Sequence, residues 1–288
     1  MTVEKKQRIL ISNLREFCKR ENLAKQQKKL TVSELAKLYC DIHSNTDDIL
    51  KSLNEITLEL SASDKIIFLS ELCHSELSTK IKNMLFIGSA EPTSAGAHSK
   101  ISYLKNKYND EAFEHFSHSI ANAKPDYASS FNECCENVFD GRCEYCILPI
   151  MNSRDGRLMS FYTLLDRYEL KICDIIDIDG ENTSSTFRHA LISRSCKENQ
   201  KKIQKNQKYV FEFSIISDTT DFFAPLLEAA NQISATLTCI DSIPTEYAPH
   251  VHKFFISFSI PSQNVLAFRL FVSLIKQTYV PLGIYKET

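Results

Sequence analysis

The stretch Ser130–Gly156, SFNECCENVFDGRCEYCILPIMNSRDG, contains one complete step from helix to strand. Its first part carries apolar side chains at helical spacing, namely Phe131, Cys134, Cys135 and Val138. Ser130 is placed to cap this helix, and Gly141 is placed to end it. The apolar run 143–150 then predicts a strand, and residues 152–156 have the composition of a polar turn.

The same alternation of helix and strand continues on both sides, over residues 83–195. We expect strands at 84–88, 172–178 and 188–194, and helices at 101–108 and 158–168. Alternating strands and helices favour a largely parallel sheet that is covered by helices. The middle of the chain is therefore predicted to be an α/β domain.

The two ends of the chain have different patterns. Residues 1–82 show helical periodicity only, with a capping box at Thr31 and Glu34 that predicts the start of a second helix. Residues 196–208 are polar and basic, which is typical of a linker. Residues 209–288 follow the order β-α-β-β-α-β, the ferredoxin-like split motif. The expected fold class is α/β plus α+β, in the units 1–82, 83–195, 196–208 and 209–288.

Composition excludes several functional classes. The net charge is −2, so bulk attraction to nucleic acid or to anionic lipid is not expected. The chain has only 6 glycines and no G-x-G pair, which excludes a P-loop, a dinucleotide fingerprint and a kinase glycine loop. The longest uncharged stretch, 254–268, is too short to span a bilayer. We expect a cytoplasmic protein with no cofactor and no membrane partner.

Ten cysteines in such a chain suggest free thiols rather than a disulfide framework. Four of them lie close together: Cys134, Cys135, Cys143 and Cys146. A zinc site is the alternative interpretation of this spacing. The helical and strand patterns favour packing instead, because free cysteine behaves as a small buried hydrophobe. No metal is expected.

Three segments resemble the prephenate dehydratase family. Residues 130–156 are similar to its helix, turn and "ADYGVLPIENS" strand, Leu164–Ile172 resembles its "LLDxYDLKI" step, and residues 187–194 resemble its return strand "TRFLVIGR". The unit 209–288 is similar to the ACT domain that often follows such dehydratases. The resemblance implies a periplasmic-binding-protein-like α/β lobe, prephenate as substrate, phenylpyruvate as product and phenylalanine as the ACT-bound regulator.

The resemblance also implies site residues. Asn152 and Ser153 match the "PIENS" motif, whose glutamate is replaced by Met151, and Arg188 matches the arginine of "TRF". We expect Asn152, Ser153 and Arg188 to bind the substrate. Thr186, one place before the family's threonine, and Arg188 are the catalytic candidates if the protein is active.

Two departures bear on activity and regulation. Asp241 and Ser242 fall at the family's "ESRP" effector motif and are the expected effector-binding residues, although Ile243 replaces the arginine. The family inserts a second lobe before the return strand, whereas here the strand 172–178 is followed almost at once by residues 187–194. A one-lobed protein offers no closed cleft, and catalysis of this kind depends on a preorganised, water-excluding cleft.

Three functions follow. The first is a catalytically inactive relative that senses a small carboxylate or an aromatic amino acid, or associates with proteins, as a homodimer through the ACT-like unit. The second is an active prephenate dehydratase in phenylalanine biosynthesis, with a fused chorismate mutase in the helical region as a weaker variant. The third is a DNA-binding regulator with a helix-turn-helix at 31–53, which the acidic Asp47 and Asp48 disfavour.

Overall fold

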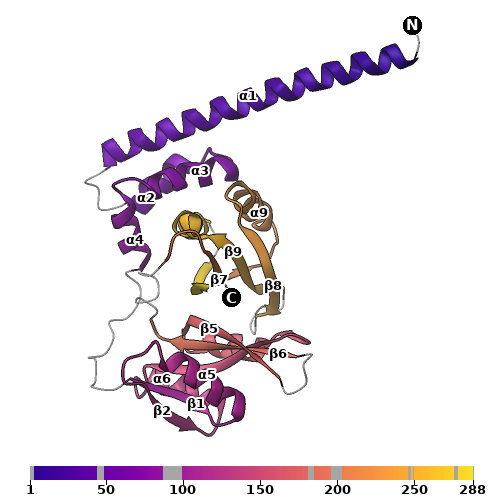
Figure 1. Ribbon diagram of the computed structural model, residues 1–288. Helices are drawn as coiled ribbons and strands as arrows, with labels where there is room; N and C mark the ends of the chain where they lie inside the picture. The colour runs from indigo at the N-terminus through magenta and orange to yellow at the C-terminus, as the bar shows by residue number, and fades with distance from the viewer. Residues whose placement is uncertain are drawn as a thin grey trace.

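The computed structural model describes residues 3–43, 49–86, 99–180, 185–195, 203–245, 248, 250–275 and 278–287. Within these ranges ten strands form one sheet, in the order β2-β1-β3-β6-β5-β10-β7-β9-β8, with β4 paired to β3 beside this path. The first half of the path is a lobe and the second half is a C-terminal unit. Helices from the N-terminal region lie over the C-terminal unit (Figure 1).

The lobe is an α/β layer structure. Its strands are β1 (Lys100–Leu104), β2 (Lys124–Ala128), β3 (Tyr145–Asn152), β4 (Gly156–Arg157), β5 (Lys171–Asp179) and β6 (Thr186–Ser193). Its helices are α5 (Lys107–Ser117), α6 (Phe131–Phe139) and α7 (Met159–Arg167). Strands β1, β2 and β3 are parallel, and β6 runs antiparallel between β3 and β5. This is the mixed α/β fold that the alternating pattern predicts.

Two apolar cores cover the two faces of the lobe sheet. Side chains of α6 and α7 pack on one face, with Cys134, Cys146 and Tyr162 among the buried residues. Helix α5 covers the other face, where Phe116 lies in a core with residues of β1, β3 and β5. The four neighbouring cysteines are thus core residues, as their periodicity predicts.

The chain returns from β5 to β6 without an intervening domain. The two strands are antiparallel neighbours whose register runs from Lys171 opposite Ser193 to Asp179 opposite Thr186. Residues 180–185 are all that lies between them. The immediate return that the sequence predicts is therefore present in the fold.

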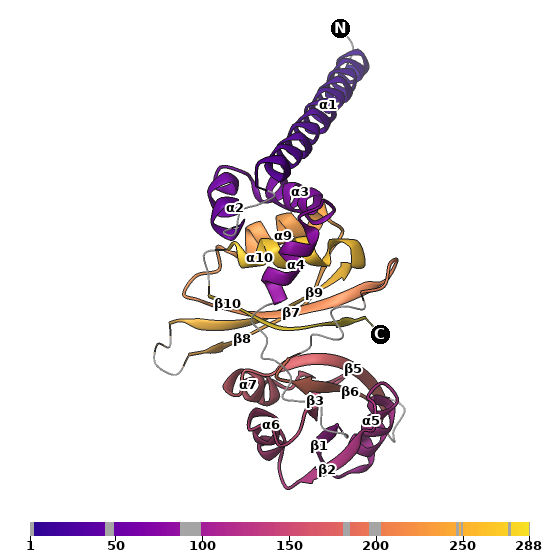
Figure 2. The same ribbon diagram turned by 90° about the vertical axis from the view of Figure 1, so that its left-hand side faces the viewer.

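The C-terminal unit has all the elements that the sequence predicts. They are β7 (Lys208–Ser217), α9 (Phe223–Gln232), β8 (Thr236–Pro244), β9 (His252–Pro261), the 3-10 turn Ser262–Asn264, α10 (Val265–Ser273) and β10 (Thr278–Lys286). The antiparallel order β10-β7-β9-β8 places the fourth strand beside the first and the third beside the second. This is the strand order of the split β-α-β motif. Helices α9 and α10 cover the face of this sheet that points away from the lobe (Figure 2).

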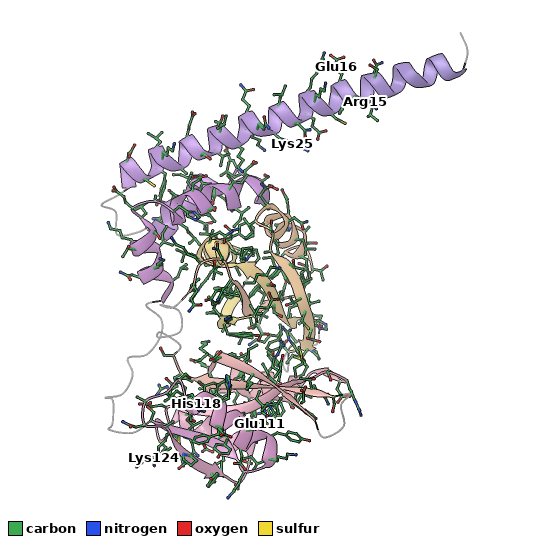
Figure 3. All side chains as sticks on the ribbon, in the orientation of Figure 1. Arg15, Glu16, Lys25, Glu111, His118 and Lys124 are labelled. Carbon is green, nitrogen blue, oxygen red and sulfur yellow. The ribbon has the colours of Figure 1, made fainter. Side chains whose placement is uncertain are left out.

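The N-terminal region consists of α1 (Val3–His43), α2 (Ile49–Thr57), α3 (Ala62–Cys73) and α4 (Ser78–Phe86). Helix α3 contacts α1, α9 and α10. Buried residues of this region, such as Tyr39 and Phe68, share one core with the C-terminal unit. The N-terminal part of α1 instead projects beyond the rest of the molecule, where Arg15, Glu16 and Lys25 are exposed along the helix (Figure 3).

Two expectations about elements are wrong. Residues 84–86 end helix α4 rather than forming a strand, and residues 87–88 lie outside the described part of the chain. Residues 101–104 form strand β1, and the helix begins only at Lys107. The run at 101–104 is buried on both faces of the sheet, and such short apolar runs carry no period that separates strand from helix.

The capping box predicted at Thr31 is also wrong. Helix α1 is continuous, and the Thr31 hydroxyl donates to the carbonyl of Gln27 at 3.1 Å, a bond within the helix. No glycine or proline interrupts residues 3–43, so nothing breaks the helix at this point. The same continuity passes through Cys40, where a helix-turn-helix needs its turn.

Two further findings concern the cysteines and membrane spans. Eight cysteines are free, in line with the expectation of free thiols rather than a disulfide framework, and Cys173 is disulfide-bonded. None of the helices in the described ranges combines the length and the apolar character that crossing a bilayer requires.

Candidate functional site

The structure brings Asn152, Ser153, Thr186 and Arg188 together at one end of the lobe sheet. Strand β3 ends at Asn152, Ser153 follows directly, and the neighbouring strand β6 begins at Thr186. We call these four residues, with Asp177 and Asp179 of β5, the strand-end group. The antiparallel register of β5 and β6 places Thr186 opposite Asp179 and Arg188 opposite Asp177. Because side chains alternate along a strand, these two pairs lie on the same face of the sheet.

Arg188 is held by a carboxylate of the next strand. Its Nε donates to Asp177 Oδ1 at 2.7 Å, and its Nη2 donates to Asp177 Oδ2 at 2.8 Å. The hydrogen bonds to Asp177 are the main cause of the raised pKa of Arg188. The two side chains are 26% and 32% exposed, so the pair lies at the surface of the lobe. A bidentate pair of this kind has fixed geometry and is close to electrically neutral.

The remaining members of the strand-end group bond to one another. The Ser153 Oγ accepts from the backbone N–H of Thr186 at 2.9 Å, and Thr186 Oγ1 donates to Asp179 Oδ1 at 3.3 Å. Asn152 Oδ1 accepts from the backbone N–H of Arg154 at 3.0 Å, and its Nδ2 donates to Asp155 at 2.7 Å. The Asn152 side chain therefore shapes the turn to β4.

Arg188 of β6 lies between two strands: its register partner on β5 is Asp177, and its register partner on β3 is Met151. A thioether is only a weak hydrogen-bond acceptor. In the described residues the carboxylate beside Arg188 thus comes from β5 through Asp177, and β3 supplies no acidic group at the register position of Met151.

The next residue of β6, His189, is buried at 2% exposure. Its Nδ1 has no hydrogen-bond partner in the described structure. Burial lowers the pKa of His189 to about 4. The imidazole is therefore neutral near pH 7. It lies on the face of the sheet that helix α5 covers, where its cross-strand neighbour is Ile176.

A second polar cluster joins the lobe to the C-terminal unit. Its centre is Arg157 of β4, whose side chain is 1% exposed. One nitrogen, Nη1, donates to Asp241 Oδ2 at 3.2 Å and to the carbonyl of Phe255 at 2.9 Å. The other, Nη2, donates to Glu212 Oε1 at 3.1 Å and to the hydroxyl of Ser257. We call Arg157 and these partners the interdomain cluster.

Tyr162 of α7 completes this cluster from the lobe side. Its hydroxyl donates to Glu212 Oε2 at 3.1 Å, and the Arg157 guanidinium lies 5.1 Å from the centre of its ring. Burial raises the pKa of both Tyr162 and Tyr285, and the charge of Glu212 adds to both shifts. The cluster thus holds one cation, the buried carboxylate of Glu212, the partly exposed carboxylate of Asp241 and the neutral phenol of Tyr162, with the neutral phenol of Tyr285 beside Glu212.

The two predicted effector residues point to opposite faces of β8. Asp241 faces the lobe and bonds to Arg157, whereas Ser242 is exposed on the other face. Asp241 also accepts from the Cys239 thiol at 3.3 Å. A bridge from Lys253 of β9 to Asp166 of α7 makes a further ion pair across the same boundary.

No signal in the sequence marks Arg157, because it directly follows a polar turn at which an exposed arginine is expected. Its partners come from residues 55, 84 and 100 positions later in the chain. No group of three or more potential metal ligands occurs in the described ranges. Burial raises the pKa of Cys134 and of Cys143 to about 12, so these thiols stay protonated and inert.

Comparison with known proteins relates the lobe to a protein family. Residues 104–208 match the family described as prephenate dehydratase. Over those residues this chain is similar to the prephenate dehydratase family. The family expected from residues 130–194 is thereby confirmed, and the match extends from the end of β1 to the start of β7.

Two solved structures share the fold of this chain. One is GqqA, described as a novel type of quorum quenching acylase, with 16% identity, a TM-score of 0.50, and coverage of 67% of this chain and 97% of that chain. The other is prephenate dehydratase from Streptococcus mutans, with 16% identity, a TM-score of 0.51, and coverage of 65% and 98%. At such identities the likeness concerns the fold alone. No curated protein matches the sequence.

Proposed function

We propose that this prephenate dehydratase-like protein has no dehydratase activity and instead binds an amino acid in its zwitterionic form. The observation that carries the proposal is the bidentate bond of Arg188 to Asp177 in the strand-end group. This bond decides which charges the site can accept.

Prephenate carries two carboxylates, so its dehydration requires cations or N–H donors that hold both of them in a closed site. Here the one guanidinium of the strand-end group is balanced by Asp177, and a second carboxylate, Asp179, lies two residues further along β5. A dianion would meet a net negative group. The immediate return from β5 to β6 further supports inactivity, because a single open lobe leaves charge interactions screened by water.

An amino acid fits the same group better than a dianion does. Its carboxylate complements the positive charge of Arg188, and its ammonium complements the negative charges of Asp177 and Asp179. The family resemblance makes an aromatic amino acid the first ligand to test. We further propose an effector role for Asp241 and Ser242, and a homodimer through the edge strand β8 of the ACT-like unit.

A thermal-shift panel tests the ligand class. Phenylalanine and tyrosine carry both charges, phenylpyruvate lacks the ammonium group, and phenethylamine lacks the carboxylate. We expect stabilisation by the amino acids only, on the order of 2.7 kcal/mol at 100 times the Kd. Asp177→Asn should abolish the shift with amino acids, while the exposed Asp218→Asn should not. A larger shift with phenylpyruvate or prephenate than with phenylalanine would contradict the proposal.

A further inference from the structure

The boundary between the lobe and the C-terminal unit is apolar apart from the interdomain cluster and the Lys253–Asp166 ion pair. Val210, Phe255, Leu282 and Tyr285 of the C-terminal unit are buried in the same core as α6 and α7. At the centre of this boundary lies Arg157, which bonds to groups of β7, β8 and β9 at once. Gly283 of β10 brings the two backbones into contact, since a Cβ there would lie 2.4 Å from the carbonyl oxygen of Ile172.

We propose that Arg157 is a lock that holds the outer strand β8 of the C-terminal unit against the lobe, and that the bond to Asp241 is the part that opens. The opening step rests on the function proposed above, because it requires a ligand that engages Asp241. The lock itself rests only on the geometry of the interdomain cluster.

The two carboxylates of the lock differ in how they are held. Glu212 is 5% exposed and is bonded by both Arg157 and Tyr162. Asp241 is 34% exposed, lies on an edge strand, and bonds to Arg157 through one oxygen. When Asp241 leaves, the guanidinium keeps Glu212, Ser257 and the carbonyl of Phe255, so no uncompensated buried charge results. Loss of Glu212 would leave such a charge.

The lock lies on the same face of the lobe as the strand-end group. After the bonds to Asp177, the charge of Glu212 also raises the pKa of Arg188, as it raises that of Arg157. Release of Asp241 shifts the charge balance around Glu212.

Hydrogen exchange followed by mass spectrometry on the full chain tests the lock. We expect Asp241→Asn to speed amide exchange in residues 236–244 about fivefold or more, while residues 145–152 of β3 exchange as in the wild type. The matched control Asp218→Asn removes the same charge at an exposed position and should leave both segments unchanged. Arg157→Lys keeps the charge but cannot bridge three strands, so residues 159–167 of α7 should also exchange faster.

The results separate the lock from its ligand. Exchange in 236–244 that stays at the wild-type rate in both Asp241→Asn and Arg157→Lys overturns the lock. If phenylalanine speeds exchange in 236–244 of the wild type, the opening step is supported. If phenylalanine stabilises the protein in the thermal-shift panel yet leaves this exchange unchanged or slower, the opening step is wrong while the proposed function stands.

Discussion

At the scale of the residue, charge balance decides what the strand-end group can bind. The sequence places Asn152, Ser153, Thr186 and Arg188 at strand ends, and the fold brings them into one group. The sequence does not predict which carboxylate pairs with Arg188, because Asp177 becomes its neighbour only through the antiparallel register of β5 and β6. Whether a carboxylate neutralises a candidate arginine depends on that register rather than on any motif.

His189 predicts how stability depends on pH. Its pKa is about 4 in the folded protein, below the value of about 6.5 for an unfolded chain. The unfolded state therefore binds more protons between these values, and stability is full above pH 6.5 and is lost as the pH falls toward 4. The loss amounts to about 3 kcal/mol at most. Denaturant unfolding at pH 7.5 and pH 4.5 measures it.

Replacement of this histidine should remove the acid sensitivity. His189→Leu eliminates the titrating group and a buried nitrogen without a partner in the described structure, so its unfolding free energy should change less between the two pH values. The exposed His118→Gln serves as the control and should behave as the wild type. An equal acid loss in wild type and His189→Leu would show that another group is responsible.

At the scale of the element, true helix caps differ from sequence matches to the capping pattern. At α6 the backbone N–H of Glu133 donates to Ser130 Oγ at 3.1 Å, and Glu133 accepts from the backbone N–H of Ser129. At Thr31 the same type of motif lies inside α1. The pattern predicts a cap only where the backbone before it leaves the helical conformation, and the sequence does not reveal this.

We expect Ser130→Ala to lower the unfolding free energy by about 1 kcal/mol, because it removes a cap bond. Thr31→Ala should change it by no more than about 0.5 kcal/mol, since the hydroxyl bond there is exposed and within the helix. Chemical denaturation of the two variants provides the comparison. A cost for Thr31→Ala as large as that for Ser130→Ala would mean that α1 begins near residue 31 in solution.

Strands β5 and β10 meet at a position that requires glycine. Gly283→Ala would place its Cβ 2.4 Å from the backbone oxygen of Ile172, which a side-chain movement cannot relieve. We expect a loss of about 1–3 kcal/mol of unfolding free energy, as for other overpacked sites. Ser242→Ala, on an exposed face of β8, is the neutral control. A Gly283→Ala variant as stable as the wild type would show that β5 and β10 do not approach this closely.

At the scale of the whole molecule, the order of elements from β3 to β10 follows from periodicity and turn residues, whereas the way the units join does not. Arg157, Glu212 and Asp241 are ordinary charged residues in the sequence, and only long-range packing makes them one cluster. The helical region also packs on α9 and α10 through α3, a contact that no local pattern contains.

The outer part of α1 should be dispensable for folding. Leu14 and Phe17 are 62% and 66% exposed, whereas Tyr39 at the other end of the helix is buried. Deletion of residues 2–24 should leave the melting temperature within about 2 °C of the full chain at low protein concentration. Tyr39→Ala should destabilise the protein by about 3–5 kcal/mol, the usual cost of an aromatic core deletion. A large drop on deletion would reveal a partner surface for α1.

Incubation of the purified full chain with prephenate, followed by ultraviolet detection of phenylpyruvate, tests the central claim most directly. The neutralised Arg188 and the open lobe predict no conversion above the rate without protein, with or without phenylalanine. Conversion that the wild type catalyses and that Arg188→Ala abolishes would contradict the claim, because it would show that the strand-end group still performs the dehydratase reaction.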